Sequence, residues 1–143
     1  MFKSSHKVFI IKYHIVIVCK YRKDLFLNEP YMEFLTNTLT EISKRYSVVY
    51  ETIGVDEDHV HLLVQSVPRY SPSKIMQLTK SITAREIFAR FPEIKEQLWG
   101  GEFWSDGGYI GTVGEGPNAE IVRRYIVKQG RNPDQLRLTE FTA

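Results

Sequence analysis

The chain has 143 residues, of which 43% are apolar and 25% are charged, close to the averages of soluble globular domains. This composition excludes collagen, coiled coil and disorder as descriptions of the whole chain, and the length predicts a single domain over residues 1–143. Nineteen basic and seventeen acidic side chains leave a net charge of +2, so total charge alone does not indicate a nucleic-acid partner.

One cysteine, Cys19, excludes a disulfide within the chain and favours a reducing compartment. The apolar stretch near the N-terminus is interrupted by Lys12 and His14. It is therefore too short to span a bilayer, and it lacks a small-residue cleavage site. We expect a cytoplasmic protein without a membrane partner.

Residues 7–19 are rich in Val, Ile, Phe and Tyr, which predicts a long strand or a bent pair of strands. Residues 20–29 are polar and irregular. Pro30 then stands where a first helical turn tolerates proline. The residues after it recur at helical spacing and predict an amphipathic helix: Phe34, Leu35, Leu39, Ile42 and Tyr46.

Residues 47–55 and 59–65 are predicted strands of a hairpin, joined by an acidic turn. Ser71 is the expected N-cap of a second helix, which Phe91-Pro92 ends. The aromatic, glycine-rich residues 100–114 predict a strand with turns or bulges, and a last helix runs between Pro117 and Gly130. This β-α-β-β-α-β order predicts an α+β, ferredoxin-like fold: an antiparallel sheet with helices on one face and an added C-terminal helix.

His59-Val60-His61 is the sharpest chemical feature. Residues i and i+2 of a strand point to the same side, so both imidazoles leave one face and can begin a divalent metal site. The alternative is a chance pair of partly exposed strand histidines. Asp58 could orient an imidazole or could be an ordinary turn residue, and His14, a lone strand histidine, is interpreted as structural.

Tyr125 and Gln129 share one face of the last helix, four residues apart. The functional interpretation is a phenol beside phosphate-binding cations, with an amide oxygen suited to a hard cation. The alternative is that Tyr125 packs while the charges face water. Phe103 and Trp104 could stack on unpaired bases or belong to the core.

Four segments in order, KYHIVIVCKYRKDLF, DEDHVHLLVQ, FWSDGGYIGTVG and Tyr-x-x-x-Gln, resemble the single-tyrosine HUH transposases of the insertion-sequence 200/605 family. HUH denotes two histidines around a bulky apolar residue, here His59 and His61. The resemblance extends from Lys7 to Gly130, and residues 131–143 carry no transferable motif.

The resemblance implies that His59, His61 and Gln129 hold Mg²⁺ or Mn²⁺ and that Tyr125 is the nucleophile. It implies cleavage and rejoining of single-stranded DNA at hairpin-marked element ends through a 5′-phosphotyrosine. It also implies a homodimer whose active sites can be completed in trans.

Basic residues are concentrated at the two ends of the chain, whereas acidic residues lie between them. If the fold brings the ends together, they can bind the DNA backbone. The candidates for that role are Lys7, Lys12, Lys20, Arg22, Arg123, Arg124 and Lys128.

Three alternatives stay open at this point. A non-enzymatic single-stranded nucleic-acid-binding module, with the topology of RNA-recognition domains, would need neither the histidine pair nor the tyrosine helix. A domesticated relative would process hairpins without transposition. A metal hydrolase would use Tyr125 only structurally and form no protein–DNA bond.

Overall fold

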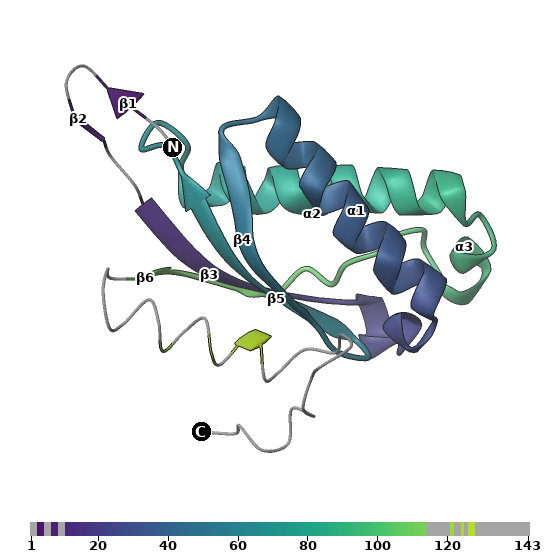
Figure 1. Cartoon of the computed structure of the whole chain (residues 1–143). Coiled ribbons are helices and arrows are strands. Elements are labelled where there is room, and N and C mark those ends of the chain that lie inside the picture. The colour runs from purple at the N-terminus through teal and green to yellow at the C-terminus, as the bar shows by residue number, and fades with distance from the viewer. Residues whose placement is uncertain are drawn as a thin grey trace.

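The computed structural model describes residues 3–4, 7–8, 11–113, 121, 124, 126 and 127 (Figure 1). Its main sheet contains β3 (Ile11–Val18), β4 (Val48–Val55), β5 (His59–Ser66) and β6 (Tyr109–Val113). The spatial order is β4-β5-β3-β6, and every neighbouring pair is antiparallel. This is the order that the ferredoxin-like interpretation requires.

Two long helices, α1 (Glu29–Arg45) and α2 (Pro72–Arg90), cover one face of this sheet (Figure 1). Asn28 and Ser71 cap them, and their side chains accept hydrogen bonds from Tyr31 N at 3.1 Å and Lys74 N at 3.0 Å. The expected Ser71 cap is therefore confirmed. A short helix, α3 (Ile94–Gln97), follows.

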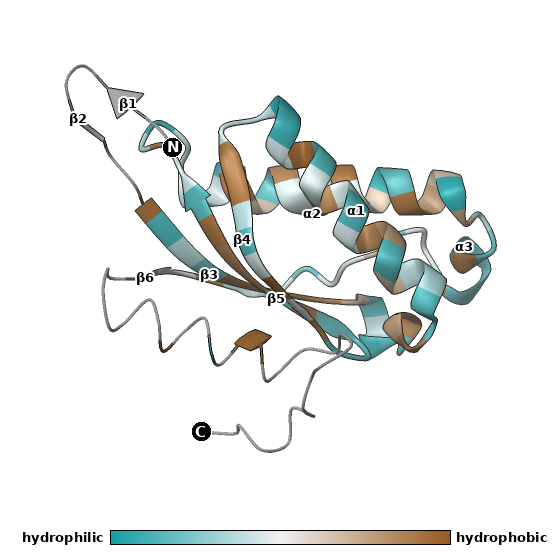
Figure 2. Ribbon diagram, viewed as in Figure 1, coloured by the Kyte–Doolittle hydropathy of each residue, from teal (hydrophilic) through white to brown (hydrophobic). Residues whose placement is uncertain are grey.

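The core lies between the sheet and these helices. Ile15, Ile17, Val60 and Leu62 point into it and are fully buried. Brown hydrophobic and teal hydrophilic segments alternate along α1 and along the strands (Figure 2), as expected for elements that bury one side. None of the helices in the described ranges is both long and apolar enough to cross a bilayer.

The described parts of the first predicted strand belong to two different sheets. A short β2 (Lys7–Val8) pairs with β1 (Lys3–Ser4) in a separate two-stranded sheet, and β3 begins at Ile11. The polar stretch after β3 contains two 3₁₀ turns, η1 (Lys20–Arg22) and η2 (Leu25–Leu27). The bent-pair alternative is thus nearer to the structure than one continuous strand.

The prediction of a strand over residues 100–114 was too long. Only β6 is a strand there, whereas residues 100–108 form a loop that meets β3 through an isolated bridge between Cys19 and Trp104. Gly100, Gly101 and Gly108 have positive φ angles, which a regular strand does not use. The ammonium of Lys80 holds this loop by donating to the carbonyls of Ser105 at 2.8 Å and Gly107 at 3.0 Å.

Phe103 and Trp104, two candidates for base stacking, belong to the core instead. They are 1% and 5% exposed, and their rings meet at 4.6 Å between centroids. The indole nitrogen of Trp104 donates to Thr83 Oγ1 at 2.9 Å. Neither ring is available to a ligand, so the core alternative is confirmed for both.

Candidate metal and tyrosine site

The face of the sheet opposite α1 and α2 carries the histidine pair. On β5, Val60, Leu62 and Val64 enter the core, so His59 and His61 leave the other side. The strand register places His61 between Val16 of β3 and Gly54 of β4. The prediction that both imidazoles share one face is confirmed, and the rigid sheet holds their ring centroids 4.9 Å apart.

His59 is oriented by the aspartate that precedes it. Its Nδ1 lies 2.7 Å from Asp58 Oδ1. A carboxylate can only accept, so Nδ1 carries the proton and the Nε2 lone pair is available for a cation. Arg22 Nε lies 3.2 Å from the second oxygen, Asp58 Oδ2. Asp58 therefore does orient an imidazole, as one of its two sequence interpretations proposed.

The turn η1, which contains Arg22, has an unusual backbone conformation. Tyr21 and Arg22 have φ angles of 60° and 51°, in the left-handed region that non-glycine residues seldom occupy. The turn begins directly after β3, where Val18 pairs with His59. The conformation brings a cation beside Asp58 from a segment far away in sequence.

His61 lies in a more buried place and is 5% exposed. Its Nδ1 is 3.4 Å from His14 Nε2, and the two rings stack with centroids 5.6 Å apart. Burial first, and then the neighbouring rings of His59 and His14, lower the pKa of His61 to about 3. The neutral ring that results is the form that binds metals.

His14 joins the pair although the sequence did not favour it for a functional role. It lies on β3 opposite Leu63, on the same face as His61, and its ring also meets the edge of Tyr109 at 5.7 Å. Burial lowers the pKa of His14 as well. Strand alternation alone could not have indicated this contact, because it depends on the register that pairs Val16 with His61.

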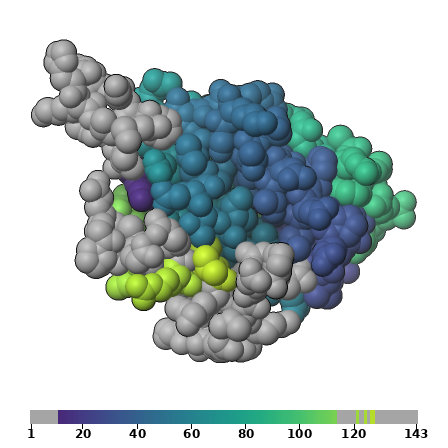
Figure 3. Space-filling view, viewed as in Figure 1, coloured from purple at the N-terminus to yellow at the C-terminus, as the bar shows by residue number. Residues whose placement is uncertain are grey.

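The last helix reaches this face at Ile126. Ile121, Arg124, Ile126 and Val127 have helical backbone, and their yellow-green atoms adjoin the blue and teal surface of the middle of the chain (Figure 3). A Cβ atom on Gly54 would collide with the backbone oxygen of Ile126. Because Gly54 pairs with His61, the buried residue after Tyr125 in sequence packs beside the histidine pair.

Several predicted site residues lie outside the described residues. These are Arg123, Tyr125, Lys128 and Gln129, and for Lys7 only the strand backbone is described. The structure thus brings His59 and His61 together, and it describes the helical neighbours of Tyr125 rather than Tyr125 itself.

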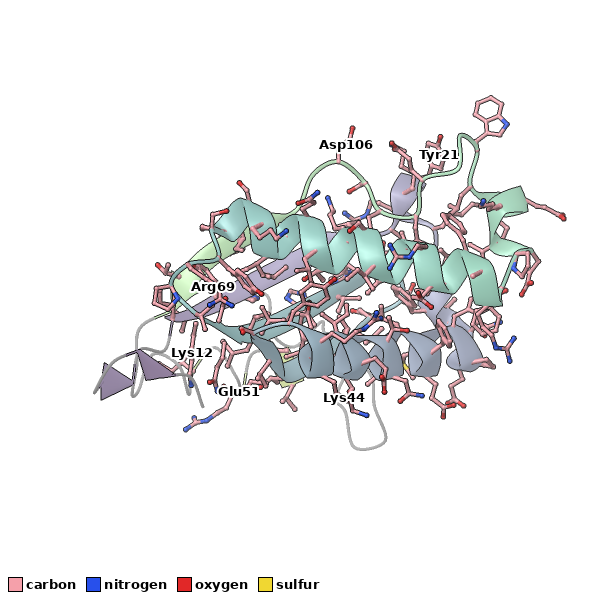
Figure 4. The ribbon with its side chains drawn as sticks, turned by 90° about the horizontal axis from the view of Figure 1, so that it is seen from above. Lys12, Tyr21, Lys44, Glu51, Arg69 and Asp106 are labelled. Carbon is pink, nitrogen blue, oxygen red and sulfur yellow. The ribbon has the colours of Figure 1, made fainter. Side chains whose placement is uncertain are left out.

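The described basic candidates are divided between the ends of the molecule. Lys12 lies 3.3 Å from Glu51, and the two labelled side chains are at the end opposite Tyr21 in Figure 4. Lys20 pairs with Glu102 at 2.8 Å and Arg22 with Asp58, whereas Arg124 is exposed. Phosphate would have to compete with carboxylates at the first three positions.

The donor set suits a divalent cation but needs completion. Imidazole nitrogens bind several divalent metal ions, whereas Mg²⁺ and Mn²⁺ favour oxygen ligands, so two imidazoles would hold these ions only together with oxygen donors. Among the residues that the structure describes, no group of three or more His, Cys, Asp or Glu side chains is arranged to hold a metal ion. A third protein ligand has to be an oxygen of another kind or come from elsewhere in the chain.

Comparisons with known proteins identify the family of this chain. A family model described as "Transposase IS200 like" matches residues 7–129. The ISDra2 transposase TnpA of Deinococcus radiodurans is 33% identical over 90% of this chain and 91% of its own length. The transposase of insertion sequence IS200 from Salmonella typhimurium is 29% identical over 87% of this chain and 80% of its own.

Two solved structures resemble the whole arrangement. A transposase crystal structure from Deinococcus radiodurans R1 superimposes with a TM-score of 0.71 and 29% identity, over 92% of this chain and 100% of the other. A REP-associated tyrosine transposase bound to a REP hairpin gives a TM-score of 0.54, over 87% and 71% of the two chains. At 13% identity, the second similarity supports the fold alone.

Proposed function

Because the chain belongs to the family of IS200-like transposases, we propose that it cleaves and rejoins single-stranded DNA at hairpin-marked element ends. In this proposal the DNA is held through a transient 5′-phosphotyrosine on Tyr125. One observation carries the proposal: two oriented imidazoles share the face on which Ile126, the residue after Tyr125, packs.

Tyr125 supplies the covalent step. Its phenol oxygen attacks the scissile phosphorus, the new Oη–P bond replaces the P–O3′ bond, and the leaving oxygen takes a proton to become a free 3′-hydroxyl. A free tyrosine has a pKa near 10, so the phenol needs an activating environment at neutral pH. The covalent bond conserves the phosphodiester, which lets a 3′-hydroxyl reverse the reaction without ATP.

His59, His61 and Gln129 would hold Mg²⁺ or Mn²⁺. The fit rests on the ring nitrogens: Asp58 occupies Nδ1 of His59 and thereby leaves Nε2 as the ligand atom, and His61 is neutral. When bound, the ion polarises the scissile phosphate and offsets the charge that develops during displacement. Arg22 and Asp58 keep the His59 ring in position throughout.

Hairpin DNA is the proposed partner because one structural neighbour is a tyrosine transposase bound to a hairpin. The homodimer is proposed from the resemblance to the family. In the single chain described, Ile126 packs against Gly54. Exchange of helices between subunits would give the trans arrangement.

Covalent capture tests the chemistry. Single-stranded DNA from the flanks of the gene is incubated with the protein and Mn²⁺, denatured, and examined for a protein–DNA band. We expect a metal-dependent band that Tyr125→Phe abolishes, since phenylalanine has no nucleophilic oxygen. Tyr46→Phe is the matched control, because Tyr46 is a half-exposed tyrosine just after α1.

Each other outcome has a defined meaning. Cleavage without a covalent band would refute the phosphotyrosine and favour the metal hydrolase. Binding that needs no metal, with neither cleavage nor band, would favour the binding module. A normal band from Tyr125→Phe would remove Tyr125 from the nucleophile role.

A further inference from the structure

The two tryptophans of the chain have opposite environments. Trp104 is 5% exposed, whereas Trp99, five residues earlier, is 82% exposed. A single exposed apolar side chain needs no explanation, but Trp99 has a second aromatic beside it. Tyr21 is 55% exposed, and its hydroxyl donates to the backbone oxygen of Trp99 at 2.8 Å.

The backbone around both rings supports this pairing. Tyr21 holds a left-handed φ of 60°, and Gly100 and Gly101, directly after Trp99, have φ angles of 89° and 78°. A left-handed tyrosine is energetically costly, and such costs concentrate where function requires a particular direction. Two segments 78 residues apart in sequence thus present large rings at one place on the surface.

Charged side chains of both signs lie around the rings. The Lys20 ammonium lies 5.7 Å from the centroid of the Tyr21 ring, the Arg22 side chain is 70% exposed, and Lys23 is exposed. Carboxylates are present too, since Glu102 pairs with Lys20 and Asp58 with Arg22. Interleaved rings and cations are what grooves for single-stranded nucleic acid use: rings stack on bases and cations meet phosphates.

The position connects this surface to the histidine pair. Arg22 follows Tyr21 in the chain and reaches Asp58, which bonds His59. Tyr21 lies at the end of the molecule opposite Lys12 (Figure 4), where β3 ends beside the start of β5. The turn that carries Tyr21 is therefore tied through Arg22 and Asp58 to His59.

We infer that Trp99 and Tyr21 form a stacking platform for unpaired nucleotides next to the scissile phosphate. The platform binds bases without reading their sequence, because every base has a π-face. That the platform lies next to the scissile phosphate rests on the proposed function. That it binds unpaired bases does not. The ligand is single-stranded DNA; duplex DNA keeps its bases stacked internally and offers none to Trp99.

Tryptophan fluorescence tests the platform directly, because Trp99 is exposed and Trp104 is not. The full chain carrying Tyr125→Phe is titrated with oligodeoxythymidylate in EDTA, so neither cleavage nor metal contributes. We expect quenching by the single strand at constant ionic strength, little by the matching duplex, and none in the Trp99→Phe variant, where only Trp104 emits.

Affinity gives the second measurement. Trp99→Ala should weaken oligothymidylate binding by about fivefold to a hundredfold, whereas Trp99→Phe should keep most of the affinity because a ring remains. Leu27→Ala is the matched control: Leu27 is an exposed apolar side chain of the neighbouring turn without a ring. It should bind as the parent does.

Three results would overturn the inference: no quenching by the single strand, unchanged affinity in Trp99→Ala, or an emission change that follows protein concentration without DNA. The last would assign the surface to a second copy of the chain. Failure of the proposed function is distinguishable, because a missing covalent band with intact quenching refutes the chemistry and spares the platform. A normal covalent band without fluorescence quenching would refute the platform and leave the phosphotyrosine chemistry standing.

Discussion

The two faces of the sheet are built from the same strands yet differ in the chemistry of the side chains that they present. Toward the helices, β3 and β5 present Ile17, Leu62 and other fully buried apolar side chains. Toward the other side the same strands present His14, His59 and His61. Because strand side chains alternate, neighbouring residues such as His61 and Leu62 belong to different parts of the molecule.

Side chains on both faces can be almost fully buried, but the groups that surround them are chemically different. His61 and Leu62 are 5% and 0% exposed. Leu62 is surrounded by apolar groups, whereas His61 is surrounded by imidazoles and is held neutral. One face therefore contributes mainly to the stability of the fold and the other mainly to binding, so substitutions on alternate residues should have separable effects.

The largest expected effect is on stability, from Leu62→Ala. Removing a fully buried leucine side chain should lower the free energy of unfolding by about 2–5 kcal/mol, as measured by urea denaturation. His61→Asn, one residue away, should change it far less while abolishing Mn²⁺ binding. Equal losses of stability in the two variants would show that the faces are not separable.

A smaller effect is expected from Asp58→Asn, which tests the binding face alone. The amide still fits the space, but its neutral oxygen accepts less strongly than a carboxylate and its NH2 group can take the same place, so the Nδ1 proton of His59 is held less firmly and metal affinity should fall by about 10- to 100-fold. Calorimetric titration with Mn²⁺ measures this. Asp106→Asn, an exposed acid in the loop before β6, is the control, and an equal loss there would indicate a general charge effect.

Patterns that are local in the sequence predicted much of the molecule. The alternation of HVHLLVQ was enough to place both histidines on one face, and the acidic turn predicted the hairpin. Ser71 was correctly predicted as the N-cap of α2. In each case the determining contacts lie within a few residues, and local contacts follow from sequence spacing.

Contacts between distant segments could not be predicted in this way. Arg22 reaches Asp58 only because two non-glycine residues adopt a left-handed turn. His14 meets His61 only through the register of β3 and β5, which no single segment contains. The glycines of residues 100–108 suggested a bulged strand, whereas tertiary contacts with Cys19 and Lys80 make this segment a loop.

The finest test of the comparison is the response of the metal-free protein to acid. An unfolded histidine has a pKa of about 6.5, whereas His61 in the fold has one of about 3. Between these pH values His61 is protonated in the unfolded chain and neutral in the folded chain. The free energy of unfolding should therefore fall as the pH drops from about 6.5 to 3, by at most about 1.4 kcal/mol per pH unit for this group.

Urea denaturation at several pH values, compared between the parent and His61→Asn, isolates this contribution from that of His14. We expect a flatter dependence in the variant, while Leu62→Ala should shift the whole curve down without changing its slope. If the parent were instead stabilised by acid, His61 would be protonated in the fold. Its face would then be built to hold a cationic ring rather than a metal ion.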